Sequence, residues 1–167
     1  MAGILKCSIL DAMKKDSRIE SFVESLGAGE AGGLSRFYLA YFDCFNRQLY
    51  YEAHDVLEHL WLKERGREGG HDTFFKGLIQ LSGAFVHLQK QFLRPGHPKD
   101  GRRLAPALRL LGLARENIAP YRPVCLSLDV DAVHRLCEAW EEALLASHCT
   151  RNPWRPDAAP TLSLLHR

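Results

Sequence analysis

The stretch TFFKGLIQLSGAFVHLQKQFL, residues 73–93, decides the fold class because its apolar residues surround most of a helix. At about 100° per residue, this arc is wide enough to contact neighbouring helices on more than one side. Its members are Phe74, Phe75, Leu78, Leu81, Phe85, Val86 and Phe92. We therefore expect a long central helix, which Pro95 and Pro98 end in the stretch RPGHP.

The remaining face of this helix carries small and polar residues. Gln80 and His87 are seven residues apart, so they lie on one line, two turns from each other. Gly83 and Ala84 lie between them and would let another backbone approach closely. This face is either solvated or one half of a polar site.

Helical periodicity also dominates outside this stretch, and no segment alternates as a strand does. Helices are expected at about residues 4–13, 17–26, 34–49, 50–64, 73–93 and 100–117, with a last one from about residue 129. We therefore predict an all-α fold, a single-domain bundle of about six helices with a Pro-rich C-terminal tail.

The chain divides into three parts along its length. Residues 1–32 form an N-terminal helical extension and the Gly-rich joint GAGEAGG, and residues 33–150 form the bundle core. Residues 151–167 form the Pro-rich tail, which we expect to be extended and anchored by Trp154. A chain of 167 residues is long enough for one domain with a sizeable core.

Composition excludes several classes of protein. The net charge is only +2, from 22 basic and 20 acidic residues, which argues against a dedicated nucleic-acid binder. The five cysteines form no CxxC pair, which argues against a disulfide framework or a structural zinc site and favours a reducing compartment. The N-terminus is too charged for a signal peptide, and no apolar run approaches a membrane span. We expect a cytoplasmic protein without a membrane partner, and homo-oligomerisation stays open.

The stretch YYEAHDVLEHLW, residues 50–61, places polar residues beside an apolar stripe. With Leu57 at the centre of that stripe, His54 and Glu58 lie at its margin as an i,i+4 pair. The face expected to meet solvent holds Glu52, Asp55 and His59. The pair is either a surface ion pair or half of a binding site that the Gln80–His87 face completes.

Together, the stretches FNRQLYYEAHDVLEHLW and FFKGLIQLSGAFVH resemble a bacterial and archaeal family called domain of unknown function 309. The family pattern is Phe-Asn, then Tyr-x-Glu-Ala-His-Glu-x-x-Glu-x-x-Trp, then Gly-Leu-Ile-Gln and a later His. The matching residues here are Phe45, Asn46, Tyr50, Glu52, Ala53, His54, Asp55, Glu58, Trp61, Gly77, Leu78, Ile79, Gln80 and His87.

The resemblance implies a compact all-α bundle and no established activity. It also implies that Glu52, His54, Glu58, Gln80 and His87 belong to one constellation. The chain departs from the pattern twice. Asp55 stands where the family usually has Glu, and Gln48 stands where it usually has Gly, a residue that could supply a positive φ.

Two classes of function remain open. The first is a small-ligand or protein interaction module with candidate binding residues Glu52, His54, Asp55, Glu58, Trp61, Gln80 and His87. The alternative is a metal-dependent or acid–base enzyme of hydrolase type acting on a small substrate, with His54 and Glu58 as candidate catalytic residues. Its candidate metal ligands are His54, Glu58 and His87, whose nitrogen and oxygen atoms suit Zn, Mn or Fe.

Spacing argues against two other kinds of metal site. His54 and His59 are five residues apart, about 140° round a helix, and cannot share one zinc ion. Asp131 and His134 form a lone Asp-x-x-His pair, whereas a di-iron bundle needs two such pairs.

Arg102 and Arg109 share a basic stripe that is either solvated or in contact with an anionic partner.

Overall fold

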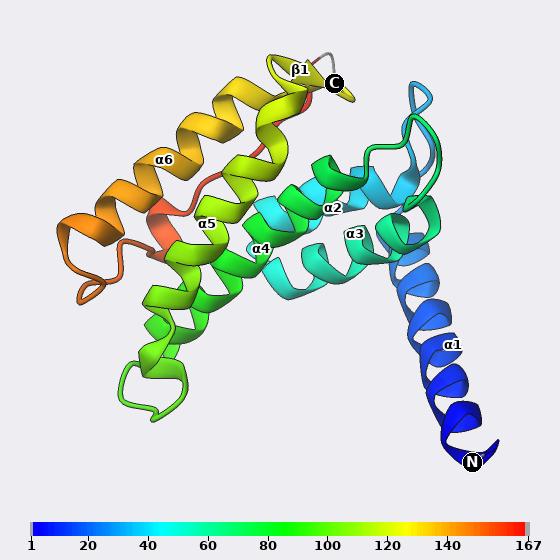
Figure 1. Cartoon of the computed structure of the whole chain (residues 1–167), viewed down its shortest axis with the longest axis horizontal. Coiled ribbons are helices and arrows are strands. Elements are labelled where there is room, and N and C mark those ends of the chain that lie inside the picture. Colours follow the sequence, from blue (N-terminus) through cyan, green and yellow to red (C-terminus); the bar gives the residue numbers. More distant parts are fainter. Residues whose placement is uncertain (1, 166–167) are drawn as a thin grey trace.

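The computed structural model describes the backbone of residues 2–165 and the side chains of residues 13–165 (Figure 1). The α-helices in this part of the chain are α1 (Ala2–Ser25), α2 (Arg36–Asn46), α3 (Tyr50–Glu64), α4 (Asp72–Leu93), α5 (Leu104–Ile118) and α6 (Val130–Ala146). The short elements are η1 (Asp100–Arg102), η2 (Ala119–Tyr121), η3 (Pro156–Ala158) and the antiparallel strands β1 (Val124–Cys125) and β2 (Leu128–Asp129). The predicted all-α class is confirmed.

Helix α4 lies at the centre of the bundle, as its wide apolar arc predicts. Helices α3 and α5 pack against it, α2 packs on α3, and α6 packs on α5, so neighbours in sequence are neighbours in space (Figure 1). The completely buried apolar side chains of α4 are Phe74, Leu78, Leu81, Ala84, Phe85 and Leu88. Phe92 differs from the expectation. It is 40% exposed and packs its ring on Trp154 of the tail, 5.3 Å between centroids.

The close approach of another helix to α4 occurs at Gly77. A Cβ atom built on Gly77 would lie 2.6 Å from Cγ2 of Ile118 and 3.0 Å from the carbonyl oxygen of Ala114, both on α5. At Gly83 the nearest atom is Cδ1 of Leu110, at 3.4 Å, which is an ordinary side-chain contact. The prediction that another backbone approaches α4 at Gly83 and Ala84 is therefore wrong. The backbone of α5 comes nearest at Gly77, one and a half turns before Gly83.

The Pro-rich tail runs back across the bundle, and Trp154 anchors it as predicted. The Trp154 side chain is only 1% exposed, and its Nε1 donates a hydrogen bond to the hydroxyl of Tyr50 at 3.1 Å. Asn46 holds a second point of the tail with two hydrogen bonds to the backbone of Leu162, both 2.7 Å long. These contacts fix the start of α3, which carries the polar residues of interest.

Two predictions about secondary structure are wrong. The short helices expected at residues 4–13 and 17–26 are one continuous helix, because residues 14–16 contain neither Gly nor Pro to interrupt it. The hairpin of β1 and β2 was not expected, because strands of two residues are too short to show periodicity.

Figure 1 shows α1 (blue) pointing away from the other helices. No helix within residues 2–165 has the length and apolar character needed to span a membrane.

The turn between α2 and α3 contains a residue with positive φ, as the usual family glycine indicates. Gln48 has a φ of 61°. The side-chain amide of Gln48 donates to the carbonyl of Pro156 at 2.8 Å, and the backbone carbonyl of Gln48 accepts from the side chain of Gln89 at 3.1 Å. These bonds hold the turn in a conformation that L-residues adopt reluctantly.

Candidate functional site

Three of the predicted site residues come together on one face of α3. One ligand atom from each of His54, Asp55 and Glu58 lies within 4.8 Å of the others, and no other residues with described side chains form such a group. The three side chains are partly accessible, with 33%, 18% and 30% of their surfaces exposed respectively. Spacing explains why Glu58 lies near the other two, because residues three and four apart on a helix are neighbours.

A lysine from α1 is bound to these carboxylates. Lys15 Nζ lies 2.7 Å from Oε2 of Glu58 and 3.5 Å from Oδ1 of Asp55. The hydrogen bond to Glu58 is the main reason that the pKa of Lys15 is raised. Burial alone would raise the pKa of Asp55, but the hydrogen bond from His54 and the charge of Lys15 outweigh burial and lower it. The carboxylate of Asp55 is therefore held in the charged form beside an ammonium group.

The expected His54–Glu58 pair is not the contact that forms. Nδ1 of His54 bonds its neighbour Asp55 at 3.3 Å, whereas Glu58 bonds Lys15. Sequence spacing allowed both arrangements. The position of α1, which decides between them, is not visible in the periodicity of α3.

His59 is buried, although it was expected to meet solvent. Its side chain is 1% exposed and its ring packs on Phe37, 4.6 Å between centroids. Nδ1 lies 3.0 Å from Oδ1 of Asp16, and Nε2 lies 3.6 Å from Oε1 of Glu20. Each ring nitrogen thus faces a carboxylate of α1, and a neutral imidazole has an N–H for only one of them. Helix α1 covers the part of α3 around His59, which the helical spacing predicts to meet solvent.

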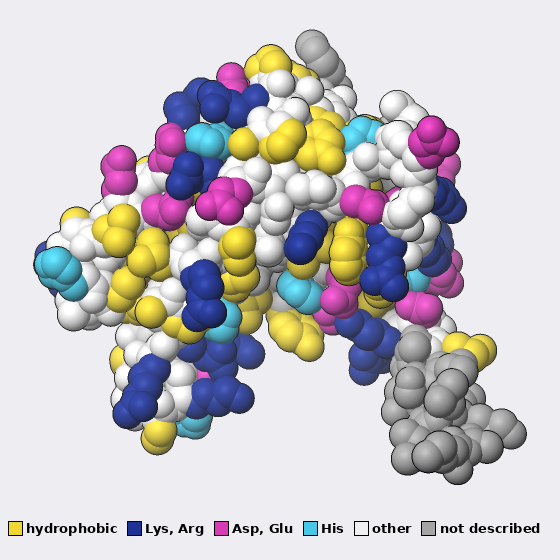
Figure 2. Space-filling view, viewed as in Figure 1, with side chains coloured by type: hydrophobic (Ala, Val, Ile, Leu, Met, Phe, Trp, Pro, Cys, Tyr) yellow, Lys and Arg dark blue, Asp and Glu magenta, His cyan; other side chains and the backbone are white. Residues whose placement is uncertain are grey.

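Lys63, one turn beyond His59, adds to the same contact. Its Nζ bonds Glu20 at 3.2 Å and lies 5.5 Å from the ring centroid of Phe37. Asp16 and Glu20 on α1 are four residues apart, as are His59 and Lys63 on α3. This matched spacing of opposite charges is the sequence signal that could have placed α1 on α3. Figure 2 shows acidic and basic side chains gathered where α1 meets the bundle.

A cleft of about 380 Å³ opens between α1 and α3, next to the carboxylate group. Helix α1 contributes Arg18, Ile19 and Phe22, and helix α3 contributes Tyr51, Glu52, Asp55 and Val56. The cleft therefore combines an apolar wall with charged groups at its edge. Two predicted binding residues, Glu52 and Asp55, line it.

Gln80 and His87 lie elsewhere, so the single constellation predicted from the sequence does not form. Oε1 of Gln80 accepts a hydrogen bond from Asn117 of α5 at 2.6 Å. Nδ1 of His87 lies 3.1 Å from Nη1 of Arg103, whose Nε donates to Asp100 at 2.6 Å. Both residues tie α4 to the segment that follows it, rather than facing α3.

The surroundings of His87 favour its neutral form. Burial lowers the pKa of His87, and the positive charge of Arg103 lowers it further. Asp100 is 3% exposed and also bonds Arg94 at 2.6 Å, so its charge is already neutralised by two arginines. His87 is therefore placed to accept a hydrogen bond in a structural network. It does not join His54 and Glu58 in the expected metal-ligand set.

Trp61 is also separate from the cleft. It is partly buried against the core on the last turn of α3, and the guanidinium of Arg65 lies 5.5 Å from its ring centroid. Its apolar contacts are sufficient to explain its size and position.

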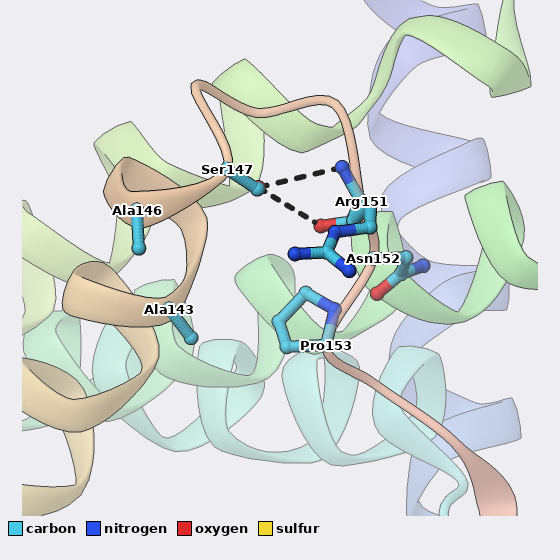
Figure 3. Close-up of a pocket in the computed structure, with 6 residues that line it drawn as sticks. All are labelled: Ala143, Ala146, Ser147, Arg151, Asn152 and Pro153. Atoms are coloured by element: carbon cyan, nitrogen blue, oxygen red, sulfur yellow. Dashed lines mark hydrogen bonds between the residues drawn. The ribbon is translucent and has the colours of Figure 1, made fainter.

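A second hollow lies where α6 meets the tail (Figure 3). It has a volume of about 270 Å³, and its lining residues are Ala143, Ala146, Ser147, Arg151, Asn152 and Pro153. Oγ of Ser147 donates to the carbonyl oxygen of Arg151 at 3.3 Å and accepts from its backbone N–H at 3.4 Å (Figure 3). These bonds stabilise a turn, and the lining contains no acid or histidine. The hollow is therefore a weaker candidate than the α1–α3 cleft.

Residues 38–96 match the family model described as Domain of unknown function (DUF309). No curated protein and no solved structure matches the chain. The matched segment contains α3 and α4 and most of α2, whereas α1 lies outside it. One wall of the cleft thus belongs to the family segment, and the other wall is contributed by the preceding helix.

Proposed function

Since residues 38–96 belong to the family of the domain of unknown function DUF309, whose description assigns no activity, we propose from the site that the chain is a small-molecule-binding module. The observation that carries this proposal is the cleft between α1 and α3, at about 380 Å³. Pockets that enclose small ligands have volumes from about 300 Å³ and combine apolar walls with a few polar groups. The α1–α3 cleft has both properties.

The contacts around the cleft support a preformed site. The ion pairs of Lys15 with Asp55 and Glu58 lie beside it, and the buried His59, one turn after Asp55 on α3, contacts Asp16 of α1. Ile19 and Val56, which line the cleft, are among the buried apolar residues. Rigid walls of this kind lower the entropy lost when a ligand binds.

A thermal-shift screen of a small-molecule library against the full chain tests the proposal. We expect at least one compound to raise the melting temperature, because a ligand that binds only the folded state stabilises it. Tyr51→Ala removes an exposed ring from the cleft and should abolish the shift. Leu62→Ala removes an exposed apolar side chain from the same helix outside the cleft and should leave the shift unchanged. A screen without hits would contradict the proposal, and so would compounds that shift the melting temperature of Tyr51→Ala as much as that of the wild type.

A divalent metal ion is the second candidate ligand, favoured by the grouping of His54, Asp55 and Glu58. One imidazole nitrogen and two carboxylates form a donor set that suits Zn, Mn or Fe. The ammonium of Lys15 already lies against both carboxylates and would compete with a metal for them. Lys15→Met should therefore strengthen metal binding, and adding Asp55→Asn to it should remove the gain.

Calorimetric titration of Zn or Mn into the wild type, Lys15→Met and the double variant Lys15→Met/Asp55→Asn measures the three metal affinities directly. At a metal concentration one hundred times the dissociation constant, binding stabilises the folded state by about 2.7 kcal/mol. Equal or undetectable binding by the wild type and Lys15→Met would exclude the metal site and leave the cleft proposal intact.

A further inference from the structure

The charges at the edge of the α1–α3 cleft specify a ligand class. Asp55 is already bonded to His54 and Lys15. Glu52 and Arg18 make no hydrogen bond or ion pair with any residue whose side chain the structure describes. Within the described side chains, one negative and one positive group of the cleft thus have no protein partner.

These two groups lie on opposite walls. Arg18 belongs to α1 and Glu52 to α3, and the rest of the lining is apolar or aromatic except for Asp55, whose carboxylate is paired with Lys15 and His54. The ring of Tyr51 is 59% exposed and the side chain of Phe22 is half-buried. A ligand that satisfies all of these groups has an anion for Arg18, a cation for Glu52 and an apolar body.

We propose that the cleft binds a free α-amino acid with an apolar side chain; this inference rests on the proposed small-molecule function. The α-carboxylate would pair with the guanidinium of Arg18, which presents parallel N–H groups suited to a carboxylate. The α-ammonium would pair with the carboxylate of Glu52, and the side chain would lie against Phe22, Tyr51 and Val56. The cleft volume of about 380 Å³ leaves room for an aromatic side chain.

Ligands with a single charge fit the site less well. An amine with the same apolar body leaves Arg18 without an anion, and a carboxylic acid leaves Glu52 without a cation. Binding such a ligand removes water from the unmatched charged group without replacing its hydrogen bonds, which lowers affinity. The site should therefore prefer the zwitterion to either singly charged analogue.

Calorimetric titration of the full chain with L-phenylalanine, 2-phenylethylamine and 3-phenylpropanoate tests this preference. We expect the dissociation constant of L-phenylalanine to be at least ten-fold below those of both analogues, a difference of about 1.4 kcal/mol. Glu52→Gln should weaken L-phenylalanine and the amine at least five-fold and leave the acid unchanged. Arg18→Gln should weaken L-phenylalanine and the acid and leave the amine unchanged.

Matched controls separate local pairing from a general charge effect. Glu142→Gln on α6 and Arg109→Gln on α5 change exposed charges far along the chain and should leave all three dissociation constants unchanged. Arg18, Arg109 and Glu142 are exposed and Glu52 is partly exposed, so each variant should fold, with a stability change of about 0.5 kcal/mol or less at the exposed positions.

Each outcome bears on a different statement. Equal affinity for the three ligands, lost in Tyr51→Ala, would overturn the amino-acid class and leave the binding module standing. Absence of L-phenylalanine binding would overturn the amino-acid class as well. The library screen then decides separately whether the cleft binds any small molecule.

Discussion

Replacing Gly77 by Ala should destabilise the protein, although alanine is the better helix former. Gly77 lies in α4 where α5 comes closest. The added methyl would lie 2.6 Å from Cγ2 of Ile118 and 3.0 Å from the carbonyl oxygen of Ala114. Ile118 is buried and the Ala114 oxygen is backbone, so neither can move without shifting α5.

The size of the effect follows from two opposing contributions. Carbon atoms pack best at about 3.5–4.0 Å, so α5 has to move by about 1 Å to admit the methyl. Overpacking of this kind costs about 1–3 kcal/mol, and the helix propensity of alanine returns about 1 kcal/mol. We expect Gly77→Ala to lower the free energy of unfolding by up to about 2 kcal/mol.

Gly83 on the same helix is the matched control. A methyl there would lie 3.4 Å from Cδ1 of Leu110, a contact that the leucine can relax. Gly83→Ala should therefore raise the free energy of unfolding, by up to about 1 kcal/mol. Urea unfolding of both variants, followed by circular dichroism, gives the two values. If Gly77→Ala proves as stable as Gly83→Ala, the close packing of α5 on α4 at this point is refuted.

Three further predictions concern the turn, the α1 contact and pH. At Gln48, with φ 61°, the Gly variant should be more stable than the Ala variant by about 1 kcal/mol, since both lose the side chain and only Ala keeps the strain. Equal melting temperatures would contradict this. Asp16→Asn removes the charge facing Nδ1 of the buried His59, so amides of residues 13–25 should exchange hydrogen faster; unchanged exchange rates would show that the contact is dispensable. Asp55 has a lowered pKa when folded, so the unfolded chain takes up the proton first as pH falls. The stabilisation by Asp55 is present above the unfolded pKa of about 3.9 and is lost as pH falls through the lower folded value. Asp55→Asn should flatten the stability curve in that acid range, and a curve parallel to the wild type would count against the His54 and Lys15 contacts.

The central position of α4 could be predicted from the sequence because burial on several sides leaves a direct trace in apolar periodicity. The burial of Trp154 was predictable for a similar reason, since a large aromatic side chain is stabilised when it is removed from water. The positive φ at Gln48 came from the resemblance, in which glycine is usual at that position.

The grouping of polar residues could not be predicted in the same way. Periodicity assigns a residue to a face of its own helix, but it does not say which helix covers that face. His59 was assigned to solvent because α1 had not been placed, and α1 buries it. Gln80 and His87 share one line on α4, yet that line faces Asn117 and Arg103 rather than α3.

Mapping amide chemical shifts during titration with L-phenylalanine tests most directly whether the α1–α3 cleft is the binding site. A ligand held as proposed should shift amides of residues 18–22 and 51–56 along one saturable curve, because these two segments form its walls. The chemical shifts of the amides of residues 143–153, around the hollow of Figure 3, should not change. Saturable shifts confined to residues 143–153, or no saturable shifts at all, would contradict the proposed site.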